Sequence, residues 1–133
     1  FTNLKELNLS KNKITEIPAE ISTIKTLEKL DVSRNKLTSL PITIGSLFNL
    51  TTLVLNQNEI AKLPAEVGNL LKLTYLDLWG NELRELPDNI IRLKYTLQTL
   101  DLRVISFRPA EQDAIDMLLP NTKIYFSTGC NCK

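Results

Sequence analysis

Residues 50–60 read LTTLVLNQNEI, and this stretch decides the fold. Its leucines at the fourth and sixth positions alternate with other residues, which is typical of a short strand with one buried face. An asparagine follows three residues after the last leucine, and an isoleucine closes the pattern. The same order of apolar residues and asparagine returns in residues 4–14, 27–37 and 73–83.

The pattern repeats with a constant step. Its asparagines fall 23 residues apart, at Asn12, Asn35, Asn58 and Asn81. A second series keeps the same step and consists of prolines that each follow an Ile or a Leu: Pro18, Pro41, Pro64 and Pro87. A fixed period of this length indicates a solenoid, in which each repeat buries its apolar face against its neighbours.

Each part of the repeat predicts a local structure. The segment that returns the chain from one strand to the next makes neighbouring strands parallel. The asparagine side chain both donates and accepts hydrogen bonds, so we expect these amides to pair backbone groups inside the narrow coil. Proline fixes φ where the chain turns to the opposite side, and apolar residues three apart then predict a short 3-10 or helical turn.

These repeats resemble the leucine-rich repeat (LRR) family, and the likeness covers residues 1 to about 108. The 23-residue step with its Leu-Pro pair is similar to the class found in Ras-suppressor-like intracellular LRR proteins and in bacterial LRR proteins. The resemblance implies an α/β solenoid, a right-handed arc with a concave parallel β-sheet and short turns on the convex side. Residues 1–108 then hold four repeats and a partial fifth.

Residues 109–126 predict a C-terminal cap. Pro109 suits the first turn of a helix, Glu111 suits its positive N-terminus, and Pro120 stops it. The apolar face of this helix is expected to comprise Ala114, Ile115, Leu118 and Leu119. Residues 123–126, KIYF, then predict a final strand. This arrangement resembles the cap of LRR proteins from pathogenic bacteria, which implies a secreted or surface protein that binds host components.

The sequence predicts a different environment for each end of the chain. Phe1 keeps the offset from Leu4 that convex anchor residues have in later repeats, which predicts an upstream repeat; a minimal cap is the alternative. An uncovered end exposes apolar surface and predicts self-association. Residues 127–133 are expected to be a flexible tail, with Cys130 and Cys132 part of it rather than a metal or redox pair.

Composition narrows the classes of function. The net charge is only +1, from 16 basic and 15 acidic residues, so we predict no binding to nucleic acid. No apolar run is long enough to span a bilayer. Histidine is absent and glycine is scarce, which excludes a His-based triad and disfavours a phosphate-binding loop. We therefore predict a recognition module rather than an enzyme.

The predicted functional surface is the concave face, where the residues between buried leucines point to solvent. Neighbouring strands lie ~4.8 Å apart, so equivalent residues stack into rows. The predicted site for a protein partner combines apolar residues with a charged rim, as interface hot spots do: Tyr75, Trp79, Val54, Asp77, Asp101 and Arg103. A different role for Trp79, the only tryptophan, is stacking on Arg103 as a cation–π pair.

Local charge suggests two further binding hypotheses. The N-terminal repeats carry a basic strip that suits a sulfated glycan or another polyanion: Lys11, Lys13, Arg34 and Lys36. The alternative is a solvated face whose charges pair with Glu6 and Asp31. Like charges on adjacent strands of the acidic part are unfavourable unless a cation relieves them. Ca²⁺ is the candidate cofactor, and its predicted ligands are Asp77, Asp101, Asn56, Glu59 and Glu82. The alternative is that solvent alone screens the repulsion between these carboxylates.

A third hypothesis is structural. A solenoid of this kind can act as a self-assembling scaffold, because its repeats stack on one another by the same surfaces throughout.

Overall fold

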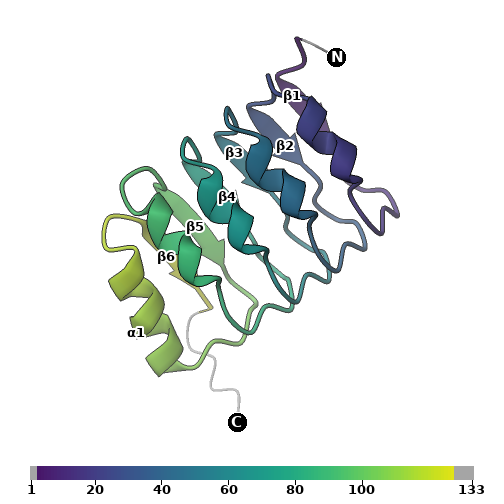
Figure 1. Ribbon diagram of the computed structural model, residues 1–133. Helices are drawn as coiled ribbons and strands as arrows, with labels where there is room; N and C mark the ends of the chain where they lie inside the picture. The colour runs from purple at the N-terminus through teal and green to yellow at the C-terminus, as the bar shows by residue number, and fades with distance from the viewer. Residues whose placement is uncertain (1–2, 128–133) are drawn as a thin grey trace.

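The computed structural model describes residues 3–127 as one stack of coils (Figure 1). Six short parallel strands form a single sheet in chain order. They are β1 (Glu6–Asn8), β2 (Lys29–Asp31), β3 (Thr52–Val54), β4 (Tyr75–Asp77), β5 (Thr99–Leu102) and β6 (Lys123–Phe126). The predicted α/β solenoid with a parallel sheet is confirmed.

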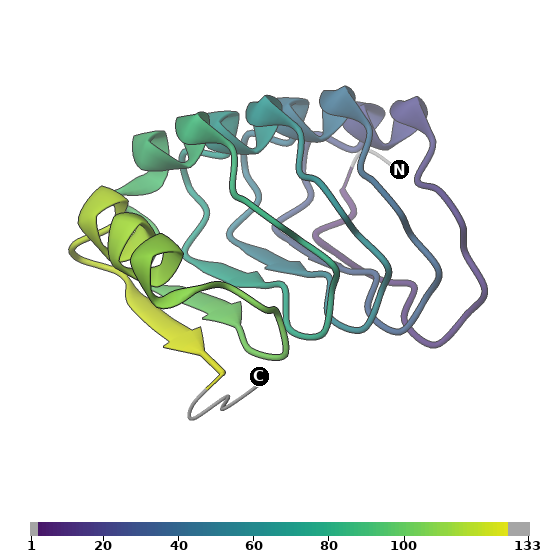
Figure 2. The same cartoon turned by 90° about the horizontal axis from the view of Figure 1, so that it is seen from below.

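A 3-10 helix follows each of the four prolines and lies opposite the sheet (Figure 2). These helices are η1 (Ala19–Thr23), η2 (Ile42–Ser46), η3 (Ala65–Asn69) and η4 (Asp88–Leu93). Each proline is extended, with φ between −69° and −65°, and its backbone leads directly into the helix. The predicted short turns on the convex side are therefore present.

The core lies between the sheet and the 3-10 helices. The central leucine of four successive strands is completely buried: Leu30, Leu53, Leu76 and Leu100. The 3-10 helices approach one another closely, because a Cβ atom added to Gly45 would lie 2.7 Å from the Glu66 carbonyl oxygen, and one on Gly68 would lie 2.4 Å from that of Asn89. Glycine at these two positions allows neighbouring coils to pack in register.

Asparagine side chains join the coils from within. The Asn58 amide nitrogen donates to the carbonyls of Val32 and Leu55, both at 3.0 Å, and its oxygen accepts from the Leu37 N–H at 3.0 Å. Two other buried asparagines make equivalent bonds: Asn35 and Asn81. Each amide therefore satisfies backbone groups of its own coil and of the preceding one.

This ladder changes at both ends. Asn12 is exposed, and its amide nitrogen donates to Leu9 and Ser10 within its own coil. In the fifth coil the equivalent residue is Ile105, which is buried and contributes apolar packing instead of a hydrogen bond. The ladder is strongest in the middle of the array.

The last coil is covered by helix α1 (Pro109–Leu118) and strand β6. Ile115 and Leu119 are buried beneath the helix, whereas Ala114 is exposed, so the predicted apolar face was too wide. The Glu111 carboxylate accepts the Arg108 N–H at 2.8 Å, which lowers the pKa of Glu111 and caps the helix.

None of the helices in residues 3–127 combines the length and apolar character needed to cross a membrane. The predictions for Phe1, Cys130 and Cys132 concern positions outside the described residues.

Candidate functional site

Four strands of the sheet end in the same side-chain turn. An Asn or Asp in the last two residues of the strand accepts the backbone N–H of the residue two positions later, at 2.9 or 3.0 Å. The pairs are Asn8 with Ser10, Asp31 with Ser33, Asp77 with Trp79, and Asp101 with Arg103. This is an Asx turn, in which the short side chain substitutes for a backbone acceptor. The acidic row of the concave face therefore has a structural role.

The third coil lacks this turn, because Val54 has no side-chain acceptor. Val54 lies beside Asp77 in the parallel register. The Asn56 amide nitrogen instead donates to the Asp77 carboxylate at 2.8 Å. In the third coil, a hydrogen bond to the next coil therefore replaces the hydrogen bond that the other coils form within their own turn.

The residue three positions after the Asn, Asp or Val of this row is held in the left-handed region, also in the third coil, which lacks the turn. Its φ is between 55° and 72° in all five coils, at Lys11, Arg34, Gln57, Gly80 and Val104. In the third and fourth coils the N–H at this position donates to the next coil, to the carbonyls of Trp79 and Arg103. The backbone that carries Trp79 and Arg103 is therefore fixed from both sides.

Arg103 is oriented by two neighbours. Its Nε lies 3.0 Å from Asp101 Oδ1 and its Nη2 lies 2.7 Å from Asp101 Oδ2, which raises the pKa of Arg103. Its guanidinium also lies over the Tyr125 ring, at 5.5 Å from the centroid. Within the described chain Arg103 has no cation–π contact with Trp79, so the predicted stacking was wrong. Strand β6 supplies the aromatic ring instead.

Burial shapes the electrostatics beside Arg103. Only 8% of Asp77 is exposed, and this desolvation raises its pKa, although the hydrogen bond from Asn56 opposes the shift. The pKa of Tyr75 is also raised, first by burial and then by the charges of Asp77 and Asp101. Negative potential from the two carboxylates therefore extends over the tyrosine.

We refer to these residues as the C-terminal cluster: Tyr75, Asp77, Trp79, Asp101, Arg103 and Tyr125. Five of them come from the predicted protein-binding set. They lie on neighbouring strands or, for Trp79 and Arg103, in the turns that follow these strands. From the sequence we predicted Tyr125 only as part of the cap. In the structure, β6 pairs with β5 so that Tyr125 lies beside Asp101. The sixth predicted residue, Val54, borders the cluster through Asp77.

The predicted calcium ligands are engaged differently. Both oxygens of Asp101 pair with Arg103, and the Asn56 amide presents its nitrogen to Asp77. Glu59 and Glu82 are exposed. Across residues 3–127 no group of three His, Cys, Asp or Glu side chains is placed to hold a metal ion. Arg103 relieves the repulsion that motivated the calcium hypothesis, which gains no support from this geometry.

The predicted basic strip lies on the flank of the first two coils. Its members, Lys11, Lys13, Arg34 and Lys36, are all exposed. Among the residues that the structure describes, none of them forms a salt bridge. Asp31, the expected partner, accepts the Ser33 hydroxyl at 2.6 Å instead.

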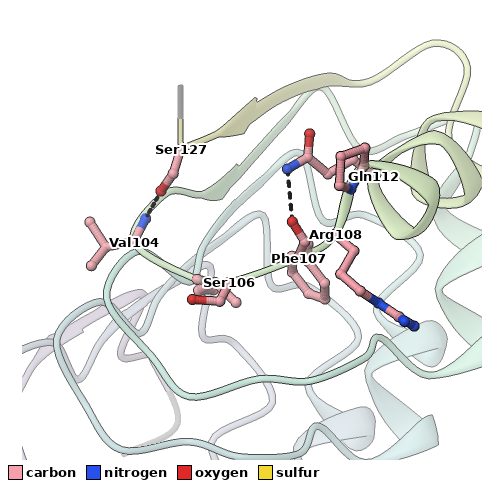
Figure 3. Close-up of a pocket in the computed structure, with 8 residues that line it drawn as sticks. Val104, Ser106, Phe107, Arg108, Gln112 and Ser127 are labelled. Atoms are coloured by element: carbon pink, nitrogen blue, oxygen red, sulfur yellow. Dashed lines mark hydrogen bonds between the residues drawn. The ribbon is translucent and has the colours of Figure 1, made fainter. Parts of the chain in front are cut away.

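A cavity of about 420 Å³ lies between the end of β5 and helix α1 (Figure 3). Two of its polar groups are already paired, since the Val104 N–H donates to the Ser127 hydroxyl and the Gln112 amide donates to the Phe107 carbonyl at 3.1 Å. The bond to Ser127 ties the end of the described chain to the last turn.

Family models agree with this architecture. A model of a leucine-rich repeat region matches residues 1–70, and a model of a leucine-rich repeat matches residues 72–93. No curated protein matches the chain significantly.

Solved structures share the fold. An LRR protein of Leptospira interrogans is 37% identical, with a TM-score of 0.80 over 93% of this chain. The LRR ectodomain of the receptor kinase GASSHO1/SCHENGEN3 from Arabidopsis thaliana is 29% identical, with a TM-score of 0.76 over 95% of this chain. The chain spans 37% of the former and 15% of the latter. With its repeats, its stacked coils and these matches, the chain belongs to the leucine-rich repeat family.

Proposed function

We propose that this LRR array binds a protein partner through the C-terminal cluster on its concave face. The observation that carries the proposal is the identity of the residues that the Asx turns present. Trp79 and Arg103 occupy these positions in the fourth and fifth coils. Trp and Arg are enriched among the residues that dominate binding energy at protein interfaces.

The cluster suits this role because its groups are held in place before binding. The Arg103 side chain is 54% exposed, although Asp101 and Tyr125 orient it. A side chain already restrained in the free protein loses less conformational entropy on binding. Trp79 and Tyr75 are half-buried, so each offers an aromatic surface on a fixed backbone.

The comparisons support binding to a protein. The Arabidopsis LRR ectodomain was solved in complex with Casparian strip integrity factor 2. The likeness to the Leptospira protein and the helix-strand cap favour the bacterial group of 23-residue Leu-Pro LRR proteins. We therefore propose a partner outside the cell, namely a host cell-surface protein.

A pull-down from host-cell surface protein tests this proposal, with wild type beside Trp79→Ala and Ser33→Ala. Ser33 occupies the equivalent turn position in the second coil and is the matched control. We expect Trp79→Ala to weaken affinity for the captured protein by about 30-fold, as loss of a hot-spot residue does. Circular dichroism must show that both variants stay folded. Equal affinity of wild type and Trp79→Ala would contradict the proposal.

A second candidate is polyanion binding by the basic strip. It rests on the absence of salt bridges at these four side chains in the described structure. Retention on heparin that falls steeply with salt, and falls further in Lys13→Gln with Lys36→Gln, is the expected result. Retention unchanged by this pair of substitutions would contradict it.

A further inference from the structure

A second surface lies along the turns that lead from each 3-10 helix into the next strand. Its segments comprise the ends of the 3-10 helices and the residues that follow them, 22–26, 45–49, 68–72 and 91–96, and contain no Asp or Glu. Glu28, which lies between the first segment and β2, pairs with Lys5 at 3.8 Å. The charged residues within the segments are all basic: Lys25, Lys72, Arg92 and Lys94. The four charges exceed the net charge of +1 of the whole chain, so the remaining residues are together net acidic.

The same turns expose large apolar side chains. Phe48 is 60% exposed, Leu71 is 49% exposed and Tyr95 is 80% exposed. The adjacent Leu47 and Leu70 are completely buried and fill the core at these turns. We refer to the four basic and three exposed apolar side chains as the basic–apolar ridge.

Contacts between coils connect the first three segments of the ridge. The Asn49 amide donates to the Lys25 carbonyl at 2.8 Å, and the Lys72 ammonium donates to the Asn49 side-chain oxygen at 3.0 Å. The Lys25 ammonium lies 5.4 Å from the centroid of the Phe48 ring. The cations therefore stand directly beside the apolar groups.

The opposite flank of the coils has a different composition. The basic strip lies on this flank in the first two repeats, without large exposed apolar side chains. In the third and fourth repeats the flank exposes Lys62 and Arg84 together with Glu59, Glu82 and Glu85. A surface of mixed sign is an ordinary solvated face. The ridge differs because it combines one sign of charge with exposed aromatic and aliphatic groups.

We propose that the basic–apolar ridge binds the surface of a lipid bilayer that contains anionic headgroups. The turns recur from coil to coil along the stack (Figures 1 and 2). The exposed Phe48, Leu71 and Tyr95 therefore follow one another in successive coils, which suits a broad interface better than a pocket. Aromatic and leucine side chains enter the boundary between headgroups and acyl chains, while lysines reach the phosphates. A sulfated sugar would leave Phe48 and Leu71 without a partner.

This proposal is independent of protein binding at the C-terminal cluster. The ridge follows the 3-10 helices, whereas the cluster lies on the sheet at the opposite side of the coils (Figure 2). A protein bound to a bilayer by its ridge would keep the concave face accessible.

Co-sedimentation with lipid vesicles tests the charge requirement. We expect binding to vesicles of phosphatidylcholine mixed with phosphatidylserine, and little binding to phosphatidylcholine alone. Lys25→Gln and Lys72→Gln should each weaken binding about fivefold, since one lysine near the surface contributes that much. The matched control is Lys62→Gln with Arg84→Gln on the other flank, where both side chains are exposed, and it should change binding little. Equal loss in both sets would overturn the proposal.

Fluorescence tests whether the apolar tips enter the bilayer. In Phe48→Trp, we expect emission to shift to shorter wavelength on anionic vesicles, while the native Trp79 of the wild type shows no shift. Phe48→Ser should weaken binding, and Ile42→Ser, an exposed apolar residue at the start of η2, should not. No shift in Phe48→Trp, or binding to polyglutamate without binding to vesicles, would overturn the proposal.

Discussion

The N-terminal and C-terminal coils build the same turn and use it differently. Ser10 and Ser33 follow the turn in the first two coils, whereas Trp79 and Arg103 follow it in the fourth and fifth. The backbone bond is the same within 0.1 Å. The turn therefore fixes the backbone but leaves the presented side chain free to vary, which is where a repeat scaffold acquires a specific function.

The two regions also differ in how their polar groups are satisfied. The Ser33 hydroxyl donates to Asp31 at 2.6 Å, so this pair is complete within one turn. Arg103 pairs with Asp101 through one edge of its guanidinium and remains half-exposed. The Ser33 turn satisfies its own side-chain donor, whereas the Arg103 turn retains donors for a partner.

The largest expected effect comes from the ladder that both regions share. Asn58→Leu leaves the Leu37 N–H and the Val32 and Leu55 carbonyls without their partner, so we expect a loss of about 3 kcal/mol in the free energy of unfolding. Asn12→Leu, at the exposed end, should cost about 1 kcal/mol or less. Urea unfolding of both variants measures the difference, and equal losses would contradict the graded ladder.

Removing the turn acceptor separates structure from function. Asp31→Ala and Asp101→Ala each remove one bond to a backbone N–H, so each should lower the free energy of unfolding by about 1 kcal/mol. Only Asp101→Ala frees the Arg103 side chain, and only this variant should weaken partner binding. Calorimetric titration with the captured partner measures the affinity of both variants. Weaker binding by Asp31→Ala would argue against a binding site confined to the C-terminal cluster.

Backbone strain is expected to differ between the regions as well. Val104 is β-branched and has φ of 58°, a conformation that disfavours such residues. It is 63% exposed, so Val104→Asn should relieve strain without opening the core and should stabilise the fold by about 1 kcal/mol. Gln57→Asn, at the equivalent unbranched position, should change stability less. Thermal unfolding of the two variants checks this order.

The smallest effect concerns the buried carboxylate. The pKa of Asp77 is raised by burial, so the folded state favours its protonated form. Its contribution to stability therefore falls as pH rises from the ordinary carboxyl range through the raised pKa. Asp77→Asn keeps an oxygen for the Trp79 N–H, as Asn8 does for Ser10, and removes this pH dependence. A wild-type minus variant difference that stays constant with pH would contradict the shift.

Much of the fold follows from the 23-residue period. The period predicts which residues of successive strands lie side by side. The strand register confirms these rows, for example Tyr75 beside Thr99. The proline series predicted the 3-10 helices, because a fixed φ at the corner selects one way to turn. These features depend on local sequence and on the nearest repeat, which a single sequence displays.

The site was harder to predict. We predicted Asp77 and Asp101 as charges at the rim of a binding site. The Asn and Asp residues that recur in this row also indicate Asx turns, which the structure contains. Among the five residues with positive φ, only Gly80 signals the left-handed conformation by its residue type; the other four are Lys11, Arg34, Gln57 and Val104. The contact of Arg103 with Tyr125 depends on β6 joining the sheet, a long-range event that no local pattern reports.

Hydrogen exchange with the captured partner tests the difference between the two regions most directly. Binding through the C-terminal cluster should slow amide exchange in residues 75–79 and 99–103 and leave residues 6–10 and 29–33 unchanged. Protection of residues 6–10 and 29–33 without protection of the C-terminal strands would contradict the proposed binding surface.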